Sequence, residues 1–247
     1  MKIAFLVPLT SNGRDWKNIE ESYFYQIFLR TLIGSTSSKY FYKIYLVIDH
    51  DDHLFFNANL KNLNTLGKSF NISIIKIINN CIEKGHLTKL WNLAFKKAYE
   101  DGCQYFYQCG DDVQFLTYNW IDDCINQLIA NQQIGLTGPL DLGRLNANKI
   151  YHPGQEHFLQ TQSFVGRKHM EIFGYYFPEE IKNWFCDDWI TKVYYPKYFY
   201  KLEHFILNKG GKQRYKISGS HNENDPVKKK CEELILDGKL KIKKYIG

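Results

Sequence analysis

Four short, continuous apolar runs constrain the fold of this chain more than any other sequence feature. They span Lys2 to Leu9, Lys43 to Ile48, Ile72 to Ile78 and Gln104 to Gln108, and charged or turn-forming residues bound them. Apolar runs of this length without polar alternation are typical of strands that are buried on both faces. The chain is therefore predicted to build a sheet that helices cover on both sides.

Two segments with helical spacing connect these runs. Apolar residues recur every three or four positions from about Trp16 to Ile33, and a second helix is predicted from about Leu87 to Glu100, where Asp101-Gly102 is a stop signal. The order strand, helix, strand, strand, helix, strand predicts an α/β fold with a mostly parallel sheet.

The second half of the chain alternates less regularly. Helices are predicted at about 120–131, 168–173 and 187–194, strands at 134–137 and 161–166, and an irregular Gly/Asn-rich stretch at 138–154. We expect one domain over residues 1–218, followed by a polar loop and a lysine-rich extension over 219–247.

The composition excludes several protein classes. With 44% hydrophobic residues among 247, the chain is too apolar for a disordered polymer. No apolar run approaches the roughly 20 residues that cross a bilayer, and the N-terminus lacks the pattern of a secretory signal. We therefore expect a cytoplasmic protein without a transmembrane segment. The six cysteines have no CxxC spacing, which predicts reduced thiols rather than a zinc site or a disulfide framework.

Polar residues gather where the predicted strands end. The loop from Thr10 to Arg14, the run from Asp49 to Asp52, and the pair Asp111-Asp112 each follow a strand. Ligands of open α/β sheets bind in the crevice at the carboxyl ends of the strands, so these residues are expected to line one cleft.

The segment Gly110-Asp111-Asp112 has two interpretations. Adjacent carboxylates at a strand end could hold Mg²⁺ or Mn²⁺ against a diphosphate, where the ion would stabilise a departing phosphate. Alternatively, Gly-Asp-Asp is ordinary turn chemistry, with Asp111 capping the next segment.

From Lys2 to about Phe205 the chain resembles a glycosyltransferase of the GT-A fold, closest in pattern to the large inverting (family 2-like) group. The resemblance rests on four segments in the family's order. They are the opening strand with Pro8 and Thr10, the strand Leu46-Val47-Ile48-Asp49, the segment from Gly85 to Val113, and the segment from Ser163 to Trp189 that contains Asp187-Asp188. At the end of the third, Gly110-Asp111-Asp112-Val113 takes the place of the family's DxD motif, with Gly110 instead of its first acid.

The resemblance implies a metal-dependent enzyme that moves a sugar from a nucleotide-diphosphate sugar, with UDP the expected nucleotide, to a hydroxyl acceptor. It places Asp111 and Asp112 at a Mn²⁺ or Mg²⁺ ion and the diphosphate, and it makes Asp188 the general base, with Asp187 beside it. It places Pro8, Thr10 and Asp49 around the nucleotide. The expected acceptors are a glycan, a lipid-linked molecule or a protein, and nucleic acid is not expected.

Further candidates have a functional and a plain structural interpretation. His221 could complete the metal shell, or it could be solvated. Lys89 and Asn92 are candidates for the nucleotide end, although Lys89 could equally be a solvated helix charge. Asp187-Asp188 could simply begin a helix, whose dipole favours acids there. The tail from Lys228 to Lys244 is either a solvated helix face or a contact surface for an anionic membrane.

Two other functions remain open on the sequence. A nucleotide- or glycan-binding module could have kept the fold and lost activity, and the missing first acid at Gly110 favours this hypothesis. A hydrophobic strand before Gly-Asp-Asp also resembles the metal motif of RNA-directed RNA polymerases, which are much longer proteins. The first alternative predicts donor binding without turnover, and the second predicts template-dependent nucleotide incorporation.

Overall fold

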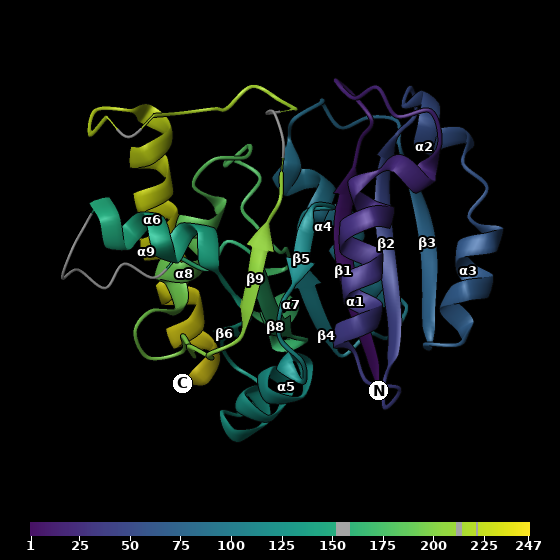
Figure 1. Ribbon diagram of the computed structural model, residues 1–247. Coiled ribbons are helices and arrows are strands. Elements are labelled where there is room, and N and C mark those ends of the chain that lie inside the picture. The colour runs from purple at the N-terminus through teal and green to yellow at the C-terminus, as the bar shows by residue number, and fades with distance from the viewer. Residues whose placement is uncertain (152–158, 211–213, 221) are drawn as a thin grey trace.

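The structure is a computed structural model that describes residues 1–151, 159–210, 214–220 and 222–247. It confirms the α/β class, with one mixed and mainly parallel six-stranded sheet in the order β3-β2-β1-β4-β8-β6 (Figure 1). The first four of these strands are mutually parallel, whereas β8 is antiparallel to its neighbours β4 and β6. The strands are β1 (Lys2–Leu9), β2 (Phe41–Asp49), β3 (Ile72–Asn79), β4 (Tyr105–Gln108), β6 (Leu136–Thr137) and β8 (Ser163–Gly166).

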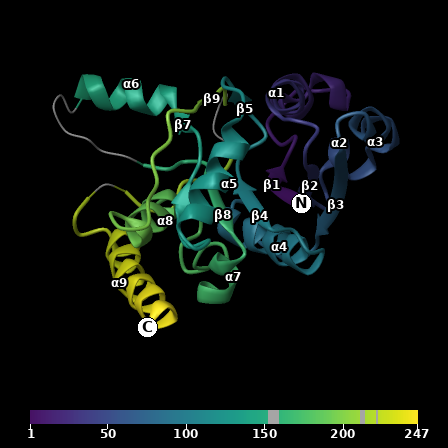
Figure 2. The same ribbon diagram turned by 90° about the horizontal axis from the view of Figure 1, so that it is seen from below.

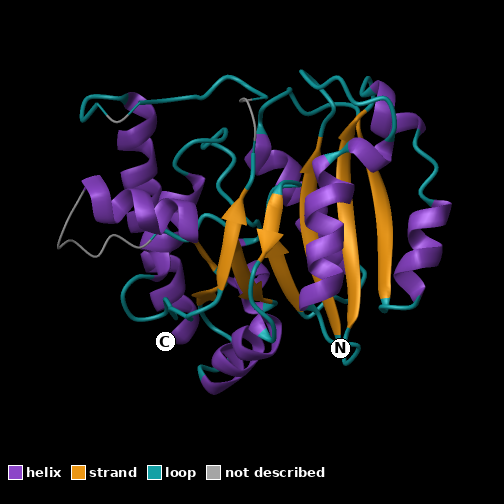
Figure 3. Cartoon of the chain, viewed as in Figure 1, coloured by secondary structure: helices purple, strands orange, loops and turns teal. Residues whose placement is uncertain are grey.

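A second sheet of three short strands continues from the end of β4 (Figure 3). Its order is β5-β9-β7, with β5 (Val113–Phe115) antiparallel to β9 (Phe205–Asn208) and β7 (Leu140–Asp141) parallel to β9. Because β5 begins directly after Asp112, this sheet brings the residues that follow β9 to the carboxyl end of β4.

The side chains of β1 alternate between two hydrophobic cores. Ile3, Phe5 and Val7 belong to the first core, together with the segment η2 (Phe24–Leu29), α1 (Arg30–Ser35) and α5 (Trp120–Ala130). Ala4 and Leu6 belong to the second, which α4 (Leu87–Glu100), α7 (Lys168–Phe173) and α8 (Cys186–Tyr194) cover. Figure 2 shows α1 and α4 on opposite faces of the sheet. Burial of the sheet on both faces explains why its strands read as unbroken apolar runs.

Helix α4 occupies the predicted positions, whereas the first predicted helix begins late. The amide of Glu21 is capped by the side chain of Asn18, which forms a short 3₁₀ turn at Ile19–Glu21. A π-helical segment and α1 then extend the helix to Ser35. Three helices appear where none was predicted: α2 (His53–Asn57), α3 (Lys61–Lys68) and, in the Gly/Asn-rich stretch, α6 (Leu142–Tyr151).

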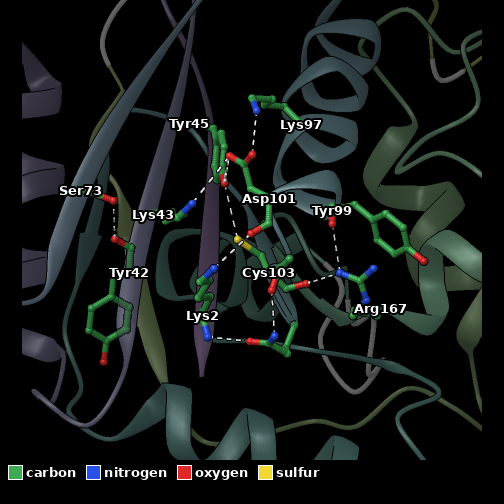
Figure 4. A network of polar contacts seen from close by, with 12 residues as sticks. Lys2, Tyr42, Lys43, Tyr45, Ser73, Lys97, Tyr99, Asp101, Cys103 and Arg167 are labelled. Carbon is green, nitrogen blue, oxygen red and sulfur yellow. Dashed lines mark hydrogen bonds and ion pairs between the residues drawn. The ribbon is translucent and has the colours of Figure 1, made fainter.

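Polar contacts fix the edge of the sheet where β4 begins (Figure 4). The Asp101 carboxylate accepts hydrogen bonds from the Tyr45 hydroxyl at 2.9 Å and from Lys97 Nζ at 2.7 Å. The Arg167 guanidinium donates to the carbonyl oxygens of Tyr99 at 3.1 Å and Cys103 at 2.8 Å. These contacts hold α4 against β2 and against the residue that follows β8. They support the sheet from the end opposite to the carboxyl ends of its parallel strands.

The lysine-rich extension forms one long helix, α9 (Pro226–Ile246), that packs on α8. Its residues Cys231, Ile235 and Ile242 belong to the second core, and Trp189 Nε1 of α8 donates to the carbonyl of Leu234 at 3.1 Å. Helix α9 therefore braces the helix that carries Asp187 and Asp188. Among the described residues, no helix is both long and apolar enough to cross a bilayer.

Gly238 permits the close packing of α9 on α8, because a Cβ there would lie 2.8 Å from Val193 Cγ2. We expect Gly238→Leu to lower the free energy of unfolding by about 1–3 kcal/mol, the usual cost of overpacking. Gly34→Leu on helix α1 is the matched control, because a Cβ at Gly34 would meet no described heavy atom within 4 Å. Denaturant unfolding measures both, and equal stabilities of the two variants would contradict the packing role of Gly238.

Candidate active site

A cavity of about 530 Å³ lies at the carboxyl ends of the parallel strands, a volume typical of small-molecule sites. The ends of β1, β2 and β4, the start of α8 and the segment after β9 contribute to its lining. Of the residues expected at the site, the cavity is lined by Pro8, Thr10, Asp49, Asp111, Asp112 and Asp187.

The loop after β1 is held by a carboxylate of the next strand end. Asp52 is 6% exposed and accepts from Thr10 Oγ at 3.1 Å, Ser11 N at 2.6 Å and Ser11 Oγ at 2.9 Å. It also caps α2 by accepting from Phe55 N at 2.9 Å. Asp52 therefore positions the loop that carries Thr10. The sequence predicts Asp52 near the cleft but indicates no function for it.

Asp49 lies at the end of β2 and faces the same cavity. Its carboxylate accepts a hydrogen bond from Asn79 Nδ2 at 2.7 Å, and the same amide nitrogen donates to the carbonyl of Ile82. Asn79 therefore orients Asp49 from the neighbouring strand β3, at the position expected for a contact with the nucleotide.

The two acids after β4 are buried beside a cation. Asp111 and Asp112 are 0% and 8% exposed. Both oxygens of Asp111 accept from Arg214, with Nη1 to Oδ2 at 2.8 Å and Nη2 to Oδ1 at 2.5 Å. The same Nη2 lies 3.8 Å from Asp112 Oδ2. Arg214 was missed by sequence reasoning, because a single arginine in a polar segment after β9 belongs to no motif.

The Asp112 carboxylate is enclosed by two glycines. A Cβ at Gly110 would lie 2.7 Å from Asp112 Oδ1, and a Cβ at Gly210 would lie 2.3 Å from Oδ2. Gly110, which replaces the first acid of the family motif, therefore makes room for Asp112. Burial, followed by the charge of Asp111, raises the pKa of Asp112 to about 6, and Arg214 opposes this shift.

The net charge of the side chains that line the cavity bears on whether a metal ion would bind there. Its described lining is formally negative by one charge when all groups are ionised. The carboxylates are those of Asp49, Asp111, Asp112, Asp141 and Asp187, and the cations are Lys84, Arg144, Arg214 and Lys216. An anionic diphosphate would add to this negative charge, so a further cation would favour its binding.

The acid pair fits a divalent cation only together with a ligand. In the described part of the chain, no group of three or more His, Cys, Asp or Glu side chains is arranged as a metal site. Mg²⁺ is usually held by one or two carboxylates and by phosphate oxygens of the substrate, which matches Asp111 and Asp112 facing a cavity. His221, the third expected ligand, lies outside the described residues.

Of the second acid pair, Asp187 faces the cavity and Asp188 does not. Asp187 lines the cavity, whereas Asp188 lies outside the lining and forms an ion pair with Lys192 Nζ at 3.1 Å on the next turn of α8. Successive residues of a helix point about 100° apart, so only one of the two faces the cavity. Burial and the neighbouring Asp188 raise the pKa of Asp187 to about 6, against the effect of Arg144.

Lys89 and Asn92 lie on α4 but not in the cavity lining. Lys89 Nζ is 3.5 Å from Glu179 Oε2. The Asn92 side chain donates to the carbonyl of Phe177 at 2.8 Å and accepts from the amides of Tyr176 at 3.0 Å and Phe177 at 2.9 Å. Both residues therefore contact the segment before α8, and neither lines the cavity where a nucleotide could bind.

Two further polar residues of the lining have unused hydrogen-bond acceptors. Gln162 is 5% exposed, and within the described chain neither its Oε1 nor Thr161 Oγ has a hydrogen-bond partner. A buried polar atom without a partner is costly, and a ligand that donates a hydrogen bond would satisfy it. No sequence motif marks these residues.

The raised pKa of Asp112 predicts how stability depends on pH. Because the folded state favours the protonated acid, this residue lowers stability as the pH rises from about 4 to about 6. In chelator-treated protein, Asp112→Asn should therefore be more stable than wild type at pH 8, by on the order of 2 kcal/mol, with a smaller difference at pH 4. Thermal unfolding at both pH values measures this, with the exposed Asp15→Asn as control. A variant that is less stable at pH 8 would contradict the assigned cost.

The contacts of Asn92 predict a structural phenotype. Asn92→Ala leaves the amides of Tyr176 and Phe177 without their acceptor, so we expect the free energy of unfolding to fall by about 2 kcal/mol. The affinity of the folded variant for UDP should equal that of wild type, as calorimetry would measure. Normal stability with weakened UDP binding would instead return Asn92 to the nucleotide site.

No protein-family model matches the sequence, and no curated protein sequence matches it. Solved structures of Staphylococcus aureus TarS do match. TarS 1–349 in complex with UDP-GlcNAc aligns with a TM-score of 0.57 at 16% identity, over 88% of this chain and 62% of TarS 1–349. The complex with UDP aligns with a TM-score of 0.56 at 15% identity, over 96% of this chain.

The chain thus spans 65% of the length of TarS 1–349 in the complex with UDP, less than two thirds of it. TarS is a GT-A-type glycosyltransferase. The likeness covers nearly all of this chain, and the mainly parallel sheet with its flanking helices agrees with the resemblance found in the sequence. The chain has the GT-A fold.

Proposed function

We propose that this protein is a glycosyltransferase that moves a sugar from a UDP-sugar to a hydroxyl group of an acceptor, with help from a divalent cation and with inversion at the anomeric carbon. The observation that carries the proposal is that a single cavity is lined both by the acid pair after β4 and by Asp187 of α8. Transfer needs these two functions at one place, one to support the departing diphosphate and one to activate the acceptor.

The arrangement of the strand ends supports a nucleotide-sugar donor. The uridine would lie between the loop of Pro8 and Thr10 and the Asp49 carboxylate, and the diphosphate would lie toward Asp111 and Asp112. Complexes of TarS with UDP and UDP-GlcNAc support UDP as the nucleotide. The unpartnered acceptors of Thr161 and Gln162 would then take hydrogen bonds from hydroxyl or amide groups of the sugar.

The departing diphosphate needs cations because the described lining is already formally negative. A bound Mn²⁺ or Mg²⁺ would neutralise the charge that develops on the leaving UDP. Asp112, with Asp111, would hold this ion at the end of β4. Gly110 and Gly210 leave room for the Asp112 carboxylate between them, room that a larger residue at either position would take.

Asp187 is the candidate general base, because it lines the cavity whereas Asp188 does not. With a pKa of about 6 it is mostly ionised at pH 7 and is a stronger base than an ordinary aspartate. The acceptor oxygen forms the new bond to the anomeric carbon while the bond from that carbon to the UDP oxygen breaks, and Asp187 receives the hydroxyl proton. Attack on the face opposite to UDP inverts the anomeric carbon.

The proposal is tested with UDP-sugars and Mn²⁺. We expect a UDP-sugar to raise the melting temperature more with Mn²⁺ than without it, and to be hydrolysed slowly in the absence of acceptor. Asp187→Asn should bind UDP nearly as wild type but lose about 10²–10⁴-fold in turnover. Asp188→Asn, one position along the same helix, is the matched control and should retain most of the rate.

Each contrary result has a distinct meaning. Loss of turnover in Asp188→Asn but not in Asp187→Asn would return the base to Asp188. Tight UDP-sugar binding without hydrolysis by the wild-type protein would favour the binding module. Absence of stabilisation by any UDP-sugar would contradict the proposed donor.

A further inference from the structure

Arg214 occupies the place where a cation is needed. Its side chain is 15% exposed, and that of Asp111 is 1% exposed. The guanidinium donates to both carboxylate oxygens of Asp111, at 2.8 Å and 2.5 Å. Asp112 lies 3.8 Å away, and the Thr10 carbonyl oxygen of the nucleotide loop lies 3.5 Å from Nη1. One side chain therefore touches the acid pair and the loop assigned to the nucleotide.

This pairing competes directly with a metal ion. A divalent cation bound by Asp111 needs carboxylate oxygens that the guanidinium now engages. The guanidinium itself has a second suitable partner, because its planar fork matches the oxygens of a phosphate as well as those of a carboxylate. A buried charge is stable only when it remains paired, so Arg214 cannot simply be expelled without a new anionic partner.

We propose that Arg214 exchanges partners when the donor binds, an inference that rests on the function proposed above. Without ligands Arg214 holds Asp111. When a divalent cation and UDP enter together, Asp111 turns to the cation and Arg214 binds the diphosphate. The contact with the Thr10 carbonyl holds the guanidinium beside the loop assigned to the nucleotide, within reach of a diphosphate that binds next to that loop.

The exchange couples the two ligands. The cation alone would leave Arg214 without its carboxylate, and UDP alone would have to compete with Asp111 for the guanidinium. With both ligands bound, every charge has a partner. Mn²⁺ should therefore bind more tightly in the presence of UDP, and by linkage UDP should bind more tightly in the presence of Mn²⁺ by the same factor.

The test measures Mn²⁺ and UDP binding in Arg214→Met. Removal of the competitor should tighten Mn²⁺ binding to the ligand-free protein by about 10-fold to 100-fold. Removal of the phosphate contact should weaken UDP binding at saturating Mn²⁺ by about 10-fold or more. Electron paramagnetic resonance of free Mn²⁺ gives the first affinity, and calorimetry with UDP gives the second.

Arg144→Met is the matched control. It removes another cation of the same cavity, but one that is exposed, so its effect on Mn²⁺ affinity should stay below about threefold. Circular dichroism checks the folding of each variant. Arg214→Lys is the second variant, because it keeps the charge and loses the fork, and it should shift both affinities in the same directions by smaller factors.

The outcomes separate the inference from the proposed function. Unchanged Mn²⁺ affinity in folded Arg214→Met and Arg214→Lys would overturn the exchange. Tighter Mn²⁺ binding with unchanged UDP binding would also overturn it, and would make Arg214 a fixed clamp on Asp111. A wild-type protein that binds no UDP at all would instead overturn the proposed function, and the inference with it.

Discussion

Two carboxylates buried side by side at the end of the central strand are the constraint on which the rest of this site depends. Asp111 and Asp112 cannot both remain ionised in a desolvated position without a cation nearby. The protein supplies Arg214 to Asp111 and leaves Asp112 with a raised pKa. In the proposed function, the same imbalance that is unfavourable in the empty protein would favour the binding of a cation together with a phosphate.

The fold determines where this charge is placed. The parallel strands β1, β2 and β4 bring the loop that carries Thr10, Asp49 and the acid pair to one edge of the sheet, and α8 brings Asp187 to the same cavity. Helix α9 packs on α8 through Gly238, and Asn92 of α4 fastens the backbone at Tyr176 and Phe177, before α8 begins. The candidate base therefore stands on a helix that α9 braces, which favours a fixed position of the base.

The sequence predicts the parts of this arrangement that local physics controls. Unbroken apolar runs locate β1 to β4, helical spacing locates α4, and polar residues at strand ends locate Asp49, Asp111 and Asp112 in the cavity. It does not predict Arg214, whose partner lies far away in the chain. The resemblance in the sequence assigns the base to Asp188, whereas Asp187 lines the cavity, because the phase of α8 decides which of the two faces it. Asn92 is likewise expected near the nucleotide, whereas its side chain bonds to the backbone of Tyr176 and Phe177. The sequence around Asn92 gives no signal of contacts with a segment so far along the chain.

The central claim is that Asp112 and Asp187 face one bound donor. X-ray diffraction from crystals soaked with UDP and Mn²⁺ tests it most directly, because the anomalous signal locates the ion independently of the nucleotide. We predict an anomalous peak at the Asp112 carboxylate, with the diphosphate against it and the uracil near Asp49, leaving room for a sugar before Asp187. Nucleotide density away from the strand ends, or a peak remote from Asp112, would contradict the claim.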